Sequence, residues 1–533
     1  MKTDSPARWL FPSIGDVVFL CIFFWILKSG LGLLNDGDTG WHIVTGNIII
    51  DTLKIPFADP FSHTMPGTPW TAHEWLAEVI FAAVHRLGGL NGVVVFTAAL
   101  ISVTCLLLYR YMVHIRVSPL LAAVLTVLAA LASMLHWLAR PHAFSFILTL
   151  GFIVVLELYQ REGKDYLKCL PVMMVFWVNL HAGYILGIML MTIYASGNLV
   201  QYLVDRSGRP ESLTMARRLG TFIAITLAAS CLNPYGPAIL YFPFHLVGRQ
   251  YIMDNILEWL SPNFHTDKLF EAMLLYMAAV FVLSKKKPDV IEGVTALLMV
   301  HMSLYSARYI PLLAIIVMPM AASRTGDVLA RLTAPFEGRG IAGRLRSRFE
   351  KVSADITPLE HMFNRHIWVY IAVIACLLAA ANGGNMGGRT LMDYRHDKKI
   401  FPVDAMEFVK QNRISGKMFN NDGWGGYIIY TSYPEYKVFF DGRSDMYGVE
   451  FLKEYVNTAR AKPGYMDVLD KYGAGWAIFD ANSPLCQLLA RADGWKLVYA
   501  DTTADVLVRD VPEYSELINR YPGVQFVRKE DDG

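Results

Sequence analysis

DGDTGWHIVTGNIIIDTLKIPFADPFSHTMPGTPWTAHEWLAEVIFAAVHRLGG, residues 36–89, is the stretch on which the interpretation of this chain depends. It begins with two aspartates, Asp36 and Asp38, directly after one apolar segment, and it ends just before the next. Both flanking segments are long enough to span a bilayer, so these carboxylates are expected at a membrane surface, where charge and a lipid can meet. We therefore interpret residues 35–90 as the active-site loop of a membrane enzyme.

The composition independently indicates a membrane protein. Hydrophobic residues make up 54% and charged residues 18% of the 533 residues, and the mean hydropathy is +0.35. A soluble chain of this length would be far less apolar. The formal net charge of +2 is close to neutral, which gives no reason to expect nucleic acid as a partner.

Apolar runs predict a polytopic α-helical protein with about eleven membrane-spanning helices. The predicted spans cover residues 13–34, 91–113, 117–138, 142–160, 167–180, 182–204, 216–232, 269–285, 289–305, 307–323 and 366–383. An odd number of spans places the two termini on opposite sides of the membrane.

The distribution of basic residues predicts the orientation. An inside amino terminus puts most Lys and Arg clusters in the cytoplasm, including Lys285–Lys286–Lys287 and the basic loop 324–365, whereas the opposite face is poor in both residues. The positive-inside rule favours this topology. The loop at 35–90 and the carboxy-terminal part of the chain are then both extracytoplasmic.

Residues 385–533 have the pattern of a small extracytoplasmic α/β domain, separate from a transmembrane domain at 1–384. Strand-length apolar runs alternate with helical patterns, and GGNMGG at 383–388 resembles a flexible link. The predicted strands cover residues 417–419, 437–440, 476–479, 496–499 and 506–508, and the predicted helices cover 403–411, 449–458 and 485–492.

Within the first loop, apolar spacing predicts two helices along the membrane surface, at 41–51 and 75–87, joined by a connector rich in Pro and aromatic residues. This arrangement resembles the GT-C superfamily of integral membrane glycosyltransferases, and in particular a poorly characterised bacterial group. Further stretches that carry the resemblance are WVNLHAG (177–183), LNPYG (232–236), EWLSP (258–262), ARYIP (307–311) and FDGR (440–443).

The resemblance implies a GT-C-like fold and a polyprenyl-linked sugar donor, used on the outer face of a bacterial inner membrane. It also implies that the acid nearest the start of the loop helix, Asp38, serves the acceptor, with Asp36 as second acid or metal ligand. Glycosyl transfer needs a carboxylate that removes or orients the acceptor proton. The alternative is that the two aspartates form a solvated turn capping a helix that begins near Thr39.

Other polar residues of the loop are His42, His63, His73 and Glu74. Asp36, Asp38, His73 and Glu74 together could build a site for Mg or Mn. No compact metal-ligand spacing is present, and His73 and Glu74 can equally cap or orient the second loop helix. Metal dependence is left open.

Arg140 and Arg308 are predicted to bind the donor phosphate. Both occur at the outward ends of spans, where an arginine can hold a phosphate bidentately. The alternative is snorkelling to lipid headgroups or pairing with a carboxylate such as Glu258. His142, Asn179 and His181 could line the same cavity or make interhelical hydrogen bonds. Glu258 and Trp259 belong to a long outward loop that could close over the donor.

Two Gly-rich motifs occur in the carboxy-terminal part, NDGWGGY at 421–427 and DGRSD at 441–445. Backbone amides of such turns can bind anions, but turns that use Gly and Asp for backbone reasons are the more common explanation. Two side chains of these motifs, Trp424 and Arg443, could face an acceptor.

The sequence thus predicts an inverting membrane glycosyltransferase with a polyprenyl-linked sugar donor and a glycan, lipid or protein acceptor. A second reading is an oligosaccharide ligase or polymerase that uses a lipid-pyrophosphate glycan. A third, non-enzymatic reading is a lipid or glycan transporter. Transporters commonly show repeated halves with broken helices, and the sequence has no such pair of Gly/Pro-interrupted segments.

Overall fold

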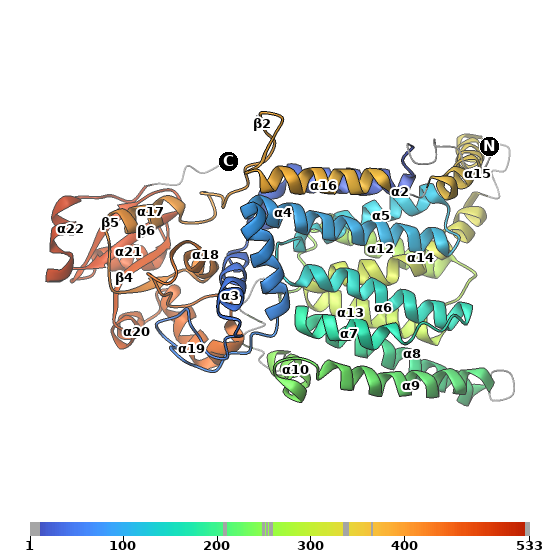
Figure 1. Ribbon diagram of the computed structural model, residues 1–533, viewed down its shortest axis with the longest axis horizontal. Helices are drawn as coiled ribbons and strands as arrows, with labels where there is room; N and C mark the ends of the chain where they lie inside the picture. Colours follow the sequence, from blue (N-terminus) through green and yellow to red (C-terminus); the bar gives the residue numbers. More distant parts are fainter. Residues whose placement is uncertain are drawn as a thin grey trace.

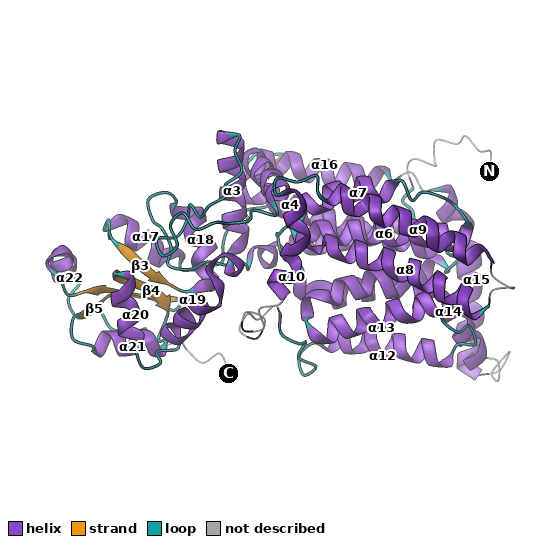
Figure 2. Cartoon of the chain, turned by 90° about the horizontal axis from the view of Figure 1, so that it is seen from below, coloured by secondary structure: helices purple, strands orange, loops and turns teal. Residues whose placement is uncertain are grey.

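The computed structural model describes residues 11–205, 210–247, 251, 254, 259–333, 340–363 and 366–527. A helical bundle forms one part of the molecule, and a mixed α/β region formed by the carboxy-terminal part of the chain lies at one end of the bundle (Figure 1). Figure 2 shows that the larger sheet lies in the α/β region, away from the bundle.

A helix occupies each of the eleven ranges predicted as spans. These helices run side by side along the long axis (Figure 1). They are α2 (Ile14–Lys28), α4 (Trp75–His114), α5 (Pro119–Ser133), α6 (His142–Glu162), α7 (Cys169–Leu180), α8 (Ile185–Val204), α9 (Pro210–Ser230), α12 (Lys268–Leu283), α13 (Val290–Tyr305), α14 (Ile310–Thr333) and α16 (Ile367–Ala381).

Five helical segments of the described chain are long and apolar enough to cross a membrane: Trp75–His114, Pro119–His136, His142–Glu162, Ala182–Val204 and Ala307–Leu332. The chain is therefore a multi-pass membrane protein. Three apolar helices are shorter, at Cys169–Leu180, Val290–Tyr305 and Ile367–Ala381. A total of eleven crossings remains a prediction.

The second loop helix and the next span are two helical segments of α4 that meet at Gly89, whose φ of 58° and ψ of −153° are not helical, so both predicted helices are present. One predicted loop contains more helix than expected. Within the predicted basic loop 324–365, α14 continues to Thr333, and α15 (Gly340–Met362) follows. Charged residues can extend a helix beyond the bilayer, which a search for apolar runs does not detect.

The carboxy-terminal region contains a four-stranded sheet in the order β3-β4-β6-β5, with β3 and β4 parallel and the other pairs antiparallel. Its strands are β3 (Lys417–Asn420), β4 (Ala474–Asp480), β5 (Trp495–Ala500) and β6 (Ala504–Arg509). Its helices are α17 (Val403–Gln411), α18 (Asp422–Ser432), α19 (Ser444–Ala459), α20 (Tyr465–Tyr472), α21 (Pro484–Arg491) and α22 (Ser515–Arg520).

Two expectations for this region were wrong. The predicted strand at 437–440 makes only an isolated bridge, between Val438 and Ser62 of the first loop. The stretch at 383–388 is not a simple link, because β1 (Asn385–Met386) and β2 (Arg389–Thr390) form a small antiparallel hairpin there. The other four predicted strands and the three predicted helices are present.

The first loop shares a hydrophobic core with the carboxy-terminal region. Trp41, Phe61 and Trp70 of the loop are buried in one cluster with residues such as Trp424 and Ile428. The loop helix α3 (Asp38–Thr52) lies between the bundle and this region (Figure 1). The first loop and the carboxy-terminal region pack as one body, which fixes the position of Asp36 and Asp38 where this body meets the helical bundle.

Candidate active site

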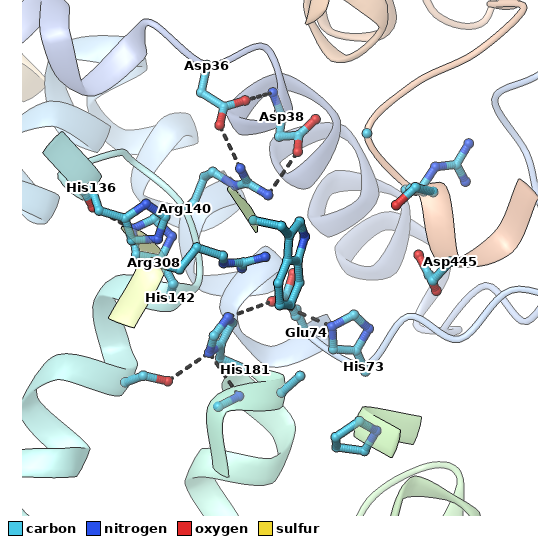
Figure 3. A pocket seen from close by; sticks show the side chains of 18 of the residues that line it. Asp36, Asp38, His73, Glu74, His136, Arg140, His142, His181, Arg308 and Asp445 are labelled. Atoms are coloured by element: carbon cyan, nitrogen blue, oxygen red, sulfur yellow. Dashed lines mark hydrogen bonds and ion pairs between the residues drawn. The ribbon is translucent and has the colours of Figure 1, made fainter. Parts of the chain in front are cut away.

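A cavity of about 340 Å³ lies where the bundle, the first loop and the carboxy-terminal region meet. The first loop contributes Asp36, Asp38, His73 and Glu74 to its lining. The bundle and the carboxy-terminal region contribute further polar residues: His136, Arg140, His142, His181, Trp259, Arg308, Arg443 and Asp445. Figure 3 shows most of these side chains turned toward the same space. Most of the predicted site residues are thus brought together.

Asp36 and Asp38 form an ion-paired cluster with Arg140. Arg140 Nη1 lies 2.7 Å from Asp36 Oδ2, and Arg140 Nη2 lies 2.9 Å from Asp38 Oδ2 (Figure 3). The backbone N–H of Asp38 donates to Asp36 Oδ1 at 2.8 Å, which forms an Asx turn. Asp36 therefore organises the turn before α3, but the alternative of a solvated helix cap is not observed, because the N-cap is Gly37 and no side chain caps the helix. Both aspartates line the cavity.

Gly442 brings the carboxy-terminal region directly against Asp38. A Cβ atom at position 442 would lie 2.0 Å from Asp38 Oδ1, which is far inside van der Waals contact. The DGRSD motif thus uses glycine for a close approach between the two parts of the molecule. Asp38 is enclosed by Arg140 on one side and by this glycine on another.

The NDGWGGY motif has a packing role. A Cβ at Gly426 would lie 2.2 Å from the carbonyl oxygen of Gly37, so α18 can approach the start of α3 only without a side chain there. Asn421 caps α18 by accepting from the N–H of Gly423. The backbone explanation of this motif accounts for its glycines, and Trp424 is buried in the shared core.

Glu74 is the centre of a second polar cluster. Its carboxylate lies 3.6 Å from His73 Nε2, 3.6 Å from His181 Nε2 and 3.7 Å from His42 Nε2. Burial disfavours a charged His73, but the Glu74 carboxylate outweighs burial and raises the pKa of His73 to about 9. Burial also opposes ionisation of Glu74, yet His73 holds the pKa of Glu74 well below its usual range. His73 and Glu74 therefore form an ion pair at neutral pH.

Hydrogen bonds fix the orientation of His181. Its Nδ1 atom accepts from the Gly183 N–H at 3.0 Å and lies 2.8 Å from Ser145 Oγ, which in turn accepts from Trp177 Nε1 at 2.7 Å. The ring proton of a neutral His181 must then be on Nε2, facing Glu74. His181 separates α7 from the short helix η3 (Ala182–Tyr184), as the predicted division between two spans required.

Arg308 lies in the cavity wall with Trp259. Its guanidinium carbon is 4.3 Å from the centre of a Trp259 ring, within the range of a cation–π contact. Glu258, the predicted neighbour of Trp259, lies outside the described residues. Arg308 and Arg140 both face the cavity (Figure 3), and Arg140 pairs with two carboxylates.

The remaining predicted histidines occupy different places. His142 stacks on His136 with ring centres 4.3 Å apart, and both line the cavity. His42 does not line the cavity but lies behind Glu74, where burial lowers its pKa to about 3. His63 contacts the carbonyl oxygen of Met418. Asn179 makes interhelical hydrogen bonds, including one from Trp75 Nε1 at 2.7 Å.

Sequence reasoning missed the buried network around Arg443. The guanidinium binds Asp441 and Asp59, with Nη2 2.7 Å from each carboxylate, and Tyr447 donates to Asp441 at 2.8 Å. Asp445, also missed, lines the cavity, and burial raises the pKa of its carboxyl. The DGRSD motif, which contains Asp441, Arg443 and Asp445, could have indicated these residues. No local sequence pattern revealed Asp59 as a partner of Arg443.

The predicted metal site of Asp36, Asp38, His73 and Glu74 is not assembled as expected. The aspartates are paired with Arg140, whereas Glu74 is surrounded by histidines. Within the described ranges, no group of three or more His, Cys, Asp and Glu side chains is arranged to hold a metal ion. The side chains as they lie do not fit the expected Mg or Mn ion.

Comparison with known proteins supports the fold. No family model matches the sequence, and no curated protein matches it. The chain is similar in structure to an oligosaccharyltransferase of Archaeoglobus fulgidus tethered to an acceptor peptide containing the NVT sequon, with a TM-score of 0.54 and 12% identity over 87% of this chain and 69% of that chain.

Two further oligosaccharyltransferase structures from Archaeoglobus fulgidus give similar values. The complex of the oligosaccharyltransferase AglB with an inhibitory peptide and a dolichol-phosphate has a TM-score of 0.55 at 12% identity, covering 89% of this chain and 70% of that one. The apo form has a TM-score of 0.52 at 12% identity, covering 93% and 75%. At this level of identity the three likenesses show that the chain shares the fold of these structures.

Proposed function

We propose that this protein is a membrane glycosyltransferase that moves a sugar from a polyprenyl-phosphate donor to an acceptor on the outer face of a bacterial inner membrane. The observation that carries the proposal is the cavity at the joint, in which Asp38 and Arg308 face the same space. A carboxylate and a cation in one cavity are the two groups that glycosyl transfer from a phosphate donor requires.

In this proposal Asp38 accepts or orients the proton of the acceptor group that attacks the sugar. Arg308 binds the departing phosphate, and Trp259 stacks on the guanidinium and holds it in place. Direct displacement by the acceptor inverts the anomeric carbon. Gly442 of the DGRSD motif forms the cavity wall next to Asp38 and leaves no room for an acceptor between them.

The fold of an oligosaccharyltransferase favours one second candidate, the transfer of a preassembled oligosaccharide from a lipid pyrophosphate. Donors that carry one sugar or several sugars, on a monophosphate or a pyrophosphate, distinguish the two candidates. Faster turnover of the multi-sugar pyrophosphate donor would favour the second.

The test is turnover by the purified full-length protein with a panel of polyprenyl-phosphate and polyprenyl-pyrophosphate sugars. Asp38→Asn is expected to lower turnover by about 10²- to 10⁴-fold, the usual contribution of a general base. Asp51→Asn is the matched control, since Asp51 is in the same helix and is exposed; it should retain full turnover. Consumption of no donor by the wild-type protein, or full activity of Asp38→Asn, would contradict the proposal.

A further inference from the structure

The geometry of Arg140 differs from that expected of a residue that waits for a phosphate. Its two terminal nitrogens each bind a different carboxylate, at 2.7 Å and 2.9 Å, and the three side chains are only 14–17% exposed. We propose that Arg140 is the built-in cation of the Asp36–Asp38 pair and takes the place of a divalent metal ion there. This inference deepens the proposed function and rests on it for the role of Asp38.

The position of Arg140 is set by the backbone as well as by charge. Its neighbour Ala139 donates its N–H to the carbonyl oxygen of Leu33 at 2.9 Å, and the Ala139 carbonyl accepts from Thr39 Oγ1 at 3.0 Å. Leu33 and Thr39 flank the aspartates on either side. The segment that carries the guanidinium is therefore tied to the same turn that carries the carboxylates.

The carboxylate oxygens are already used in a way that disfavours a metal ion. One oxygen of each aspartate binds the guanidinium, and Asp36 Oδ1 accepts from the backbone of Asp38. Mg²⁺ and Mn²⁺ need several oxygen ligands around one point. A dication between the two carboxylates would also lie beside the guanidinium, and the two like charges would repel each other.

Arg140 is then a positioning residue. It pairs with Asp38 and holds that carboxylate in the cavity wall beside Gly442, and contact with the donor phosphate is assigned to Arg308. This revises the expectation that Arg140 itself binds the phosphate. The guanidinium is part of the chain and is always charged, so it would organise the carboxylate pair without an exchangeable ion.

Mn²⁺ binding to the purified full-length protein tests this directly, by electron paramagnetic resonance of the free ion. The wild-type protein should bind Mn²⁺ at the pair at least about tenfold more weakly than Arg140→Ala, in which the two carboxylates have lost their guanidinium. Adding Asp36→Asn to Arg140→Ala should remove that site. Arg86→Ala is the matched control, because Arg86 pairs with the exposed Asp51 of the same loop; it should gain no site.

Turnover provides a second, separate measurement. EDTA should leave wild-type turnover unchanged, and added guanidinium should restore part of the turnover that Arg140→Ala loses. Arg140→Lys, which keeps one charge but cannot bridge both aspartates, should be intermediate, and it replaces Arg140→Ala if that variant does not fold.

Stoichiometric Mn²⁺ at the wild-type pair, or EDTA inhibition reversed by Mn²⁺, would overturn the inference. So would a folded Arg140→Ala variant that gains no Mn²⁺ site and is not rescued by guanidinium. If no donor is consumed, the proposed function fails, but the Mn²⁺ experiment still decides what occupies the pair.

Discussion

Two arginines in this molecule each lie between two aspartates, and they differ mainly in exposure. Both arginines line the cavity, but the side chains of Arg443, Asp441 and Asp59 are at most 1% exposed, whereas those of Arg140, Asp36 and Asp38 are 14–17% exposed. A fully buried network has a mainly structural effect, because each charge depends on its partners. The same side chains at a cavity wall can instead present a carboxylate to a substrate.

The two clusters are adjacent in space although they come from different parts of the sequence. Arg443 belongs to the same DGRSD motif as Gly442, which touches Asp38. The buried cluster thus anchors the wall against which the cavity cluster is placed. The comparison predicts that changes in the first cluster affect stability and that changes in the second affect turnover.

The largest effect should come from Arg443→Ala, which leaves two carboxylates buried without their cation. Loss of one partner of a buried ion pair costs about 3–5 kcal/mol in the free energy of unfolding. Thermal unfolding in detergent, followed by tryptophan fluorescence, measures the change. Arg86→Ala, which breaks an exposed pair, should cost only about 0–1 kcal/mol. Equal losses of stability in the two variants would contradict the expectation that the buried ion pair contributes more than the exposed one.

Gly442→Ala should lower turnover by changing the contact between the carboxy-terminal region and Asp38. The added methyl group would displace the Asp38 carboxylate, because no room exists between them. A displacement of about 1 Å at a reacting group can reduce turnover about 10²-fold. We expect the turnover number to fall by roughly this factor while the protein remains folded, as judged by gel filtration. Unchanged turnover would mean that Asp38 does not act from this position.

Arg308→Ala should weaken binding of the donor more than binding of the acceptor. Loss of a charge-assisted hydrogen bond costs about 1.5–3 kcal/mol, which corresponds to roughly a 10- to 100-fold change in affinity. The KM for the lipid donor should rise by that factor, with a smaller change in the KM for the acceptor. An effect confined to the acceptor would assign Arg308 to the other side of the reaction.

A pH dependence of stability due to His73 is also expected. Its pKa is raised from 6.5 to about 9 by Glu74 despite burial. The folded state therefore holds this proton more tightly than the unfolded state, so the stabilisation is complete below pH 6.5 and is lost as the pH rises through about 9. Unfolding midpoints of the wild-type protein and His73→Gln, compared from pH 6 to 10, should converge at the alkaline end. Parallel curves would exclude the His73–Glu74 ion pair.

Helix positions could be predicted from the sequence because each apolar run carries its own signal. Even the division at His181 was confirmed, since α7 ends at Leu180 and η3 begins at Ala182. The run at 437–440 has the same local character as a strand, but its hydrogen bonds go to residues of the first loop. A sequence pattern does not reveal such a distant partner.

The candidate site was predicted in composition and not in arrangement. Asp36, Asp38, Arg140, Glu74 and Arg308 do line one cavity. The sequence did not reveal that Arg140 binds the two aspartates, because Arg140 and Asp36 are 104 positions apart. Gly442 was noted only as a turn residue, since close approach to Asp38 depends on how two distant regions pack.

A density map of the purified protein with a bound polyprenyl phosphate tests the central claim most directly. The account predicts the phosphate within hydrogen-bonding distance of Arg308, inside the cavity and beside Asp38, with Arg140 still bound to both aspartates. A phosphate bound outside this cavity, or a cavity closed to the lipid by the carboxy-terminal region, would contradict it.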